Sequence, residues 1–221
     1  MTMDPVTVQY PGGCVFQDFT HTFSDNKVTA ILGPSGCGKT TLLFAIASAF
    51  GKTGQISFVF QEPRLVPWIS LLNNIALVLD GTKKEKQERA YTFLEKVHLG
   101  SSANKLPREM SGGERQRVSI ARAFSCKSSI LLMDEPFQSQ DISLKSRLVE
   151  TFLDLQKTEQ RTVIAVTHDV QEAVTIADDL LVLGGKPAHI VHQSTSPDLD
   201  PVHIAQVLNV QSQLFSSIQQ G

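Results

Sequence analysis

Short apolar runs alternate with longer amphipathic segments along most of the chain. Each run is rich in valine, isoleucine and leucine and has the length of a buried strand. The segments between the runs are longer, and their apolar residues recur at helical spacing. This alternation predicts an α/β domain whose sheet is mainly parallel. The predicted strands are residues 28–32, 56–60, 130–134, 162–167 and 180–183.

Two stretches carry a helical pattern without strands. No strand-like run occurs between residues 63 and 124, so this interval is predicted to be a helical subdomain inserted into the α/β domain. Near the C-terminus the apolar residues again keep roughly helical spacing, which predicts a terminal helix that packs on the body. These residues are Ile204, Val207, Leu208, Leu214, Phe215 and Ile218.

Length and composition limit the number of domains, the kinds of partner and the cellular compartment that the sequence allows. A chain of 221 residues can bury one large core, and we expect residues 1–221 to form a single domain that contains the helical subdomain. The 20 Lys and Arg residues nearly balance the 22 Asp and Glu residues, so no overall basic field exists and we expect no nucleic-acid partner. An odd number of cysteines, three, favours a reduced, cytoplasmic setting.

The sequence predicts no membrane anchor of its own. The N-terminal segment MTMDPVTVQYPGG lacks a basic start followed by an apolar stretch. The longest apolar run, LLFAIASAF, has about half the length that a membrane span needs. Any role at a membrane therefore requires a partner protein.

The clearest chemical signal is a glycine-rich stretch between the predicted strand 28–32 and an apolar helical segment. It satisfies the phosphate-loop pattern G-x-x-x-x-G-K-[ST]. Glycines let backbone N–H groups converge on phosphate oxygens, the lysine reaches the terminal phosphates, and the threonine offers an oxygen to Mg²⁺. This loop alone is compatible with kinases, GTPases, helicases and transport ATPases. It consists of Gly33, Pro34, Ser35, Gly36, Cys37, Gly38, Lys39, Thr40 and Thr41.

Two carboxylates narrow the choice among these classes. The run ILLMDEP is a buried strand that delivers Asp134 and Glu135 at its C-terminal end, the edge at which α/β sheets bind ligands. Asp134 is placed to hold the ligand shell of Mg²⁺, and Glu135 to orient and deprotonate an attacking water.

The segment MSGGERQRVSIARAF predicts a second contact with phosphate. Ser111 and Glu114 have the spacing of a capping box at a helix start. Gly112 and Gly113 weaken that start unless the backbone must approach something closely. A second positive helix end therefore fits a second phosphate contact.

The motifs, and their order along the chain, resemble those of the ATP-binding-cassette (ABC) ATPases, the nucleotide-binding subunits of membrane transporters. The resemblance covers almost the whole chain. GPSGCGKTT matches the Walker A loop, VFQEP the Q-loop, MSGGERQR the signature, ILLMDEP Walker B, FQSQD the D-loop and VTHD the switch histidine. It implies a P-loop NTPase of the ABC ATPase type that binds ATP and Mg²⁺ and hydrolyses ATP.

The resemblance also implies that two copies pair head to tail as a homodimer. Ser111 and Gly113 of one copy would then face the γ-phosphate of an ATP held by Lys39 of the other. The D-loop residue Asp141 would lie at the same shared site.

Three further residues receive roles from the resemblance alone. Gln61 would sense Mg²⁺ and the attacking water, and His168 would contact the γ-phosphate. Tyr10 falls where the family has an aromatic that stacks on adenine.

The resemblance extends to the importers of nitrate, sulfonates and taurine, on the segment VFQEPRLVPWISLLNNIAL. It implies a peripheral subunit on the cytoplasmic face of the membrane, bound to permease subunits through the helical insertion and served indirectly by an extracytoplasmic solute-binding protein. An exporter subunit and a non-transport ABC ATPase are the alternatives. A P-loop nucleotide kinase would lack the segment SGGERQR.

The chain departs from the family pattern in three places. Only 22 positions separate Lys39 from Gln61, so the antiparallel β-subdomain is expected to be reduced. Gln140 in the D-loop replaces a usual apolar residue, which puts its packing across the dimer in doubt. Glu114 stands where glutamine is common, which we take as neutral.

Cys37 adds an expectation about reactivity. It lies in the phosphate loop close to a helix N-terminus, where a thiolate is favoured. We therefore expect a reactive thiol whose alkylation MgATP would prevent.

Overall fold

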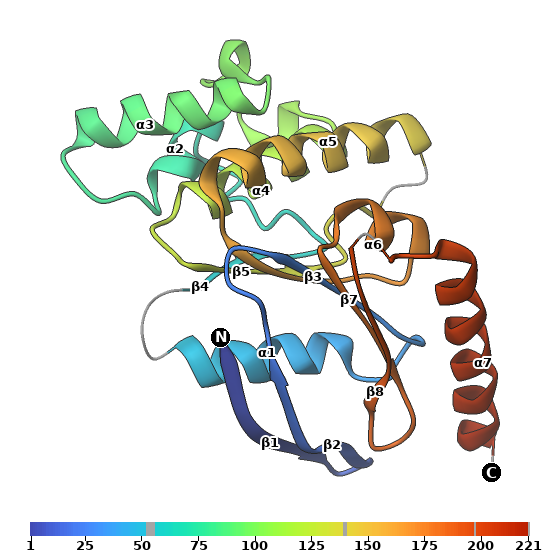
Figure 1. The fold of residues 1–221 in the computed structure, drawn as a ribbon. Coiled ribbons are helices and arrows are strands. Elements are labelled where there is room, and N and C mark those ends of the chain that lie inside the picture. The colour runs from blue at the N-terminus through green and yellow to red at the C-terminus, as the bar shows by residue number, and fades with distance from the viewer. Residues whose placement is uncertain (52–55, 139–140, 197, 221) are drawn as a thin grey trace.

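The structure is a computed structural model that describes residues 1–51, 56–138, 141–196 and 198–220. Its centre is a six-stranded sheet in the order β4-β5-β6-β3-β7-β8, with helices on both faces (Figure 1). The first five of these strands run parallel, and β8 pairs antiparallel with β7 at the edge. The bounds are β3 Val28–Leu32, β4 Ile56–Val59, β5 Ile130–Asp134, β6 Thr162–Val166, β7 Asp179–Gly184 and β8 His189–Thr195.

The five predicted strands are confirmed, and β8 is an addition that the apolar pattern did not indicate. Five of the seven residues of β8, HIVHQST, are polar, and all seven are exposed or half-buried, because an edge strand covered on one side needs no continuous apolar run. The predicted α/β class with a mainly parallel sheet is confirmed as well.

Hydrophobic clusters cover both faces of the sheet. Alternate residues of β5 point to opposite faces: Leu131 and Met133 join the core beneath α4 and α5, whereas Ile130 and Leu132 join the core beside α1. Figure 1 shows α1 on one face of the sheet and α4 and α5 on the other. The bounds are α1 Lys39–Phe50, α4 Gly112–Ser125 and α5 Ile142–Glu159.

A hairpin of β1 (Thr2–Tyr10) and β2 (Gly13–Thr22) forms a separate two-stranded antiparallel sheet. Its buried residues Met3 and Phe16 pack into the core that contains Leu42 and Ile46 of α1. The small size of this sheet agrees with the expected reduction of the antiparallel subdomain. Residues 52–55, part of the shortened segment, lie outside the described residues.

The described interval 63–124 contains helices and turns, as its pattern predicted. Figure 1 shows α2 and α3 together at the end of the molecule farthest from α1. The boundaries of a helical subdomain at 63 and 124 stay a prediction. Besides α4, the interval contains α2 Leu71–Ala76, α3 Lys83–Lys96 and two short 3₁₀ turns, Gly100–Ser102 and Pro107–Glu109.

Helix α6 (Val170–Ile176) precedes β7, and α7 (Pro201–Gln220) follows β8 as the last described element. The predicted terminal helix is confirmed, and it packs on the body through the buried side chains of Ile204 and Phe215. Leu214 is instead 52% exposed, and the side chain of Ile218 lies outside the described part of the structure.

Candidate active site at the carboxyl edge of the sheet

The phosphate loop connects β3 to α1 through a tight turn. Gly38 precedes α1 with φ 107°, a conformation that costs other residues more than glycine. A Cβ atom at Gly38 would lie 2.4 Å from Cγ1 of Val15. Packing against the β2 strand and the backbone conformation therefore both require glycine at this position.

The Lys39 side chain is buried inside this loop, with 7% of its surface exposed. Its Nζ donates hydrogen bonds to the carbonyl oxygens of Gly33 and Pro34, both at 2.9 Å. Two of the three donors of the ammonium group are thus used by the loop itself. The loop holds a positive charge at the start of α1, where the helix dipole also favours an anion.

Thr40 and Asp134 come together from the first turn of α1 and the end of β5. The Thr40 hydroxyl lies 3.1 Å from each carboxylate oxygen of Asp134. Burial raises the pKa of Asp134, and the hydrogen bond from Thr40 opposes this shift. A hydroxyl and a carboxylate are hard oxygen ligands, so this pair fits Mg²⁺.

Glu135 and His168 form a second pair at the same edge. Oε1 of Glu135 lies 3.3 Å from Nδ1 of His168, and the backbone N–H of Glu135 donates to the carbonyl of Val166 at 3.0 Å. Glu135 has φ 44°, a value that is uncommon outside glycine and that clusters at functional sites.

Gln61 follows β4 and is exposed. Its Nε2 donates a hydrogen bond to Oε1 of Gln138, which follows the Walker B segment. The structure thus places Gln61 near the loop that carries Glu135, and the sequence did not identify Gln138 as its partner.

Gln116 is a further residue that the sequence analysis missed. It lies on α4, has only 6% of its surface exposed, and donates through Nε2 to the carbonyl oxygens of Phe60 at 3.1 Å and Pro136 at 2.8 Å. It therefore joins the residue before Gln61 to the residue after Glu135. The available signal was a glutamine on the apolar stripe of a helix, since buried amides need partners.

The signature forms the predicted capping box at the start of α4. The Ser111 hydroxyl donates to Oε2 of Glu114 at 2.8 Å and accepts from the Glu114 N–H at 3.3 Å. The backbone N–H and the hydroxyl of Ser111 hold the pKa of Glu114 below its usual value.

The two signature glycines differ in solvent exposure. Gly112 is exposed with open space around it, whereas Gly113 is buried, and a Cβ on it would lie 2.1 Å from Cδ1 of Leu144. Both line a pocket with Gln61 and Gln138. The signature of one chain thus adjoins its Q-loop, and its contact with a phosphate of another copy stays a prediction.

Tyr10 and Asp141 stand at the edges of the predicted site. Tyr10 ends β1, is 55% exposed and lines a pocket with Gly36 and Cys37 of the phosphate loop. Asp141 caps α5, accepting hydrogen bonds from the N–H groups of Ser143 and Leu144. Gln140, whose packing the sequence put in doubt, lies outside the described residues.

The expected favoured thiolate at Cys37 is contradicted. Only 3% of Cys37 is exposed, and burial raises the pKa of its thiol even though Lys39 acts in the opposite direction. A nearby helix N-terminus lowers the pKa of a thiol, but here desolvation of the thiolate raises the pKa by more.

We predict that Cys37 reacts with iodoacetamide more slowly than the half-buried Cys126, because a buried thiol with a raised pKa has little thiolate and little access. Mass spectrometry of each cysteine during labelling measures both rates. In guanidinium chloride the two rates should become similar. Faster labelling of Cys37 in the native protein would contradict the buried position.

The described part of the chain contains no helix both long and apolar enough to cross a membrane.

The comparisons with known proteins agree with this geometry. A family model described as ABC transporter matches residues 16–138. The aliphatic sulfonates import ATP-binding protein SsuB 2 of Pseudomonas syringae pv. tomato is 38% identical over 192 residues, which cover 83% of this chain and 82% of the relative. The taurine import ATP-binding protein TauB of Chromobacterium violaceum is 35% identical over 217 residues, covering 89% of this chain and 83% of the relative.

A solved structure adds the fold. It is a dimeric, post-hydrolysis state of an ATP-binding cassette bound to ADP and Pi, with a TM-score of 0.74 and 25% identity, covering 88% of this chain and 98% of that chain. The order of motifs, the parallel sheet and these matches lead to one conclusion. The chain belongs to the ABC transporter family and is an ATP-binding subunit that hydrolyses ATP.

Proposed function

We propose that this chain energises the import of sulfonate- or taurine-type solutes, as a homodimer bound to permease subunits on the cytoplasmic face of the membrane. The observation that carries the catalytic part is the meeting of Lys39, the Thr40–Asp134 pair and the Glu135–His168 pair at one edge of the sheet. The solute class rests on the names of the relatives, which are import proteins for aliphatic sulfonates and taurine.

Lys39, Thr40 and Asp134 would bind the reactive end of ATP. The Lys39 ammonium would exchange the carbonyls of Gly33 and Pro34 for phosphate oxygens. Thr40, Asp134 and Gln61 are the residues that would hold Mg²⁺, which shields phosphate charge when bound. The half-buried Asp134 would gain a positive neighbour, which offsets the burial that raises its pKa.

Glu135 would act as the general base that takes a proton from the attacking water, and His168 would orient that carboxylate and contact the γ-phosphate. The 3.3 Å contact between the two side chains supports this division of roles. Catalysis of this kind consists mostly of positioning and charge stabilisation. Tyr10 would stack on the adenine, because it is exposed beside the phosphate loop.

The signature needs a second copy to reach a phosphate. Ser111 and Gly112 are exposed at the start of α4, where the helix N-terminus favours an anion, and Asp141 lies at the start of the neighbouring α5. The dimeric form of the matched cassette supports a homodimer in which these residues complete the site of the partner.

Exposed apolar side chains in the helical interval support the permease contact. Trp68, Leu77 and Tyr91 are 78%, 60% and 43% exposed. All three belong to the helical interval to which the resemblance assigns the permease contact, and exposed apolar surface is common at interaction sites. A coupling helix of the permease would cover them, and the extracytoplasmic solute-binding protein would act only through that permease.

Replacing Glu135 by glutamine should lower kcat by about 10²–10⁴-fold, because the amide cannot accept the proton. ATP would then stay bound, and the variant should run as a dimer with ATP and as a monomer with ADP in size-exclusion chromatography with light scattering. Adding Ser111→Arg should abolish the dimer by placing bulk at the facing phosphate. A monomer with ATP at high protein concentration would contradict self-pairing.

Cells that depend on this chain should lose uptake of labelled taurine or ethanesulfonate when Lys39 is replaced by alanine, because Lys39 is required to hold the phosphates of ATP. Uptake of labelled nitrate serves as the comparison. Loss of nitrate uptake alone would contradict the solute class, and loss of efflux in place of uptake would favour an exporter.

A further inference from the structure

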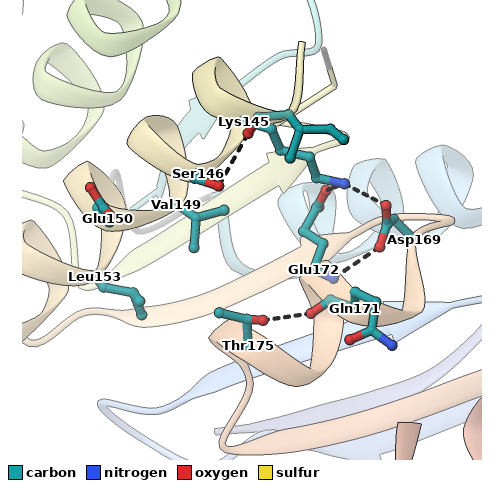
Figure 2. A pocket seen from close by; sticks show the side chains of 10 residues that line it. Lys145, Ser146, Val149, Glu150, Leu153, Asp169, Gln171, Glu172 and Thr175 are labelled. Carbon is teal, nitrogen blue, oxygen red and sulfur yellow. Dashed lines mark hydrogen bonds and ion pairs between the residues drawn. The ribbon is translucent and has the colours of Figure 1, made fainter. Parts of the chain in front are cut away.

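A cluster of three charged side chains joins α5 to the loop that carries His168. Figure 2 shows Lys145 on α5 reaching toward Asp169 and Glu172 at the start of α6. The Lys145 ammonium pairs with Oδ2 of Asp169 and lies 3.2 Å from Oε2 of Glu172. The three side chains line one groove between the two helices, and none belongs to the residues assigned to ATP.

The cluster is shielded from water. The side chains of Lys145, Asp169 and Glu172 are 23%, 35% and 3% exposed. Burial lowers the pKa of Lys145, but the two carboxylates outweigh it and raise that pKa overall. Lys145 thus stays charged between the two acids, whereas burial raises the pKa of the buried Glu172. Exposed ion pairs contribute little to the stability of the fold. Removing one partner of a buried ion pair is costly, because the other charge is left buried without a partner.

Asp169 controls the backbone next to His168. Its Oδ1 accepts the N–H of Glu172 at 2.9 Å and caps α6, while its own N–H donates to the Thr167 hydroxyl at 3.1 Å. The residues on both sides of His168 are therefore held by contacts that involve Asp169. A shift of Asp169 would move the His168 imidazole relative to Glu135.

Lys145 itself is tied to the start of α5. Its backbone N–H donates to the carbonyl of Asp141 at 3.0 Å, and Asp141 caps this helix. The ammonium of Lys145 therefore connects the first turn after the D-loop to the residue that follows His168.

We propose that Lys145 is a positioning residue for ATP hydrolysis, which holds Asp169, and through it His168, against the first turn of α5. The proposal rests on the proposed roles of Glu135 and His168. Lys145 touches neither the nucleotide site nor Glu135; it keeps His168 at its 3.3 Å contact with the Glu135 carboxylate. Movement of the D-loop segment would then shift the position of the His168 side chain.

The test compares three variants of the full chain. Lys145→Gln should lower kcat by about 10- to 100-fold, because small misplacement of a catalytic group has effects of this size. The KM for ATP should stay unchanged, since the phosphate loop is not altered. Lys145→Arg should restore kcat. The matched control is Lys157→Gln on the same helix, whose exposed lysine pairs with the exposed Asp154, and it should leave kcat unchanged.

A double-variant cycle separates positioning from general stabilisation. If Lys145 acts through Asp169, the combination of Lys145→Gln with Asp169→Asn should lower kcat no further than the worse single change. Additive losses would overturn the proposal, as would a Lys145→Gln variant with the kcat of the unaltered protein.

A second measurement does not depend on hydrolysis. The imidazole ¹⁵N resonances of His168, assigned by His168→Ala, should shift in Glu135→Gln and also in Lys145→Gln, but not in Lys157→Gln. An unchanged His168 signal in Lys145→Gln would overturn the positioning role. A shift in a protein without measurable ATPase would support that role and count against the proposed function instead.

Discussion

The parallel hydrogen bonds that β6 makes with β5 on one side and β3 on the other are the interactions on which the active site depends. Val166 of β6 is paired with Asp134 of β5 and with Ile31 of β3. The pairing continues past the strand ends, where Glu135 N–H donates to Val166 and Thr167 N–H donates to Ile31. Parallel strands share their carboxyl edge. At this edge lie the phosphate loop, the Walker B acids and the switch histidine, each at the end of its strand or just after it.

The polar groups at this edge of the sheet satisfy one another. Lys39 bonds to loop carbonyls, Thr40 to Asp134, and Glu135 contacts His168. Buried polar groups without partners would destabilise the fold. Phosphate and Mg²⁺ would replace these partners by stronger, charge-assisted ones, so nucleotide binding exchanges contacts within a formed site. The charged cluster at Lys145 extends the same principle to the loop behind His168.

The sequence predicted the parts whose signal is local. Continuous apolar runs gave the five parallel strands, and the spacing of glycines and Ser111 gave the phosphate loop and the capping box. It could not predict β8, because five of the seven residues of this edge strand are polar. It misjudged Cys37, because burial depends on tertiary packing. It also missed Gln116 and Lys145, since their partners lie 20 or more residues away in the chain.

The central claim is that this edge of the sheet recognises the β- and γ-phosphates of the nucleotide through the phosphate loop. Calorimetric titration with ATP, ADP and AMP in the presence of Mg²⁺ tests it most directly. Each hydrogen bond to a charged group contributes about 1.5–3 kcal/mol, so loss of the β-phosphate contacts should weaken AMP binding by more than about 100-fold relative to ADP. AMP that binds as tightly as ADP would contradict the account.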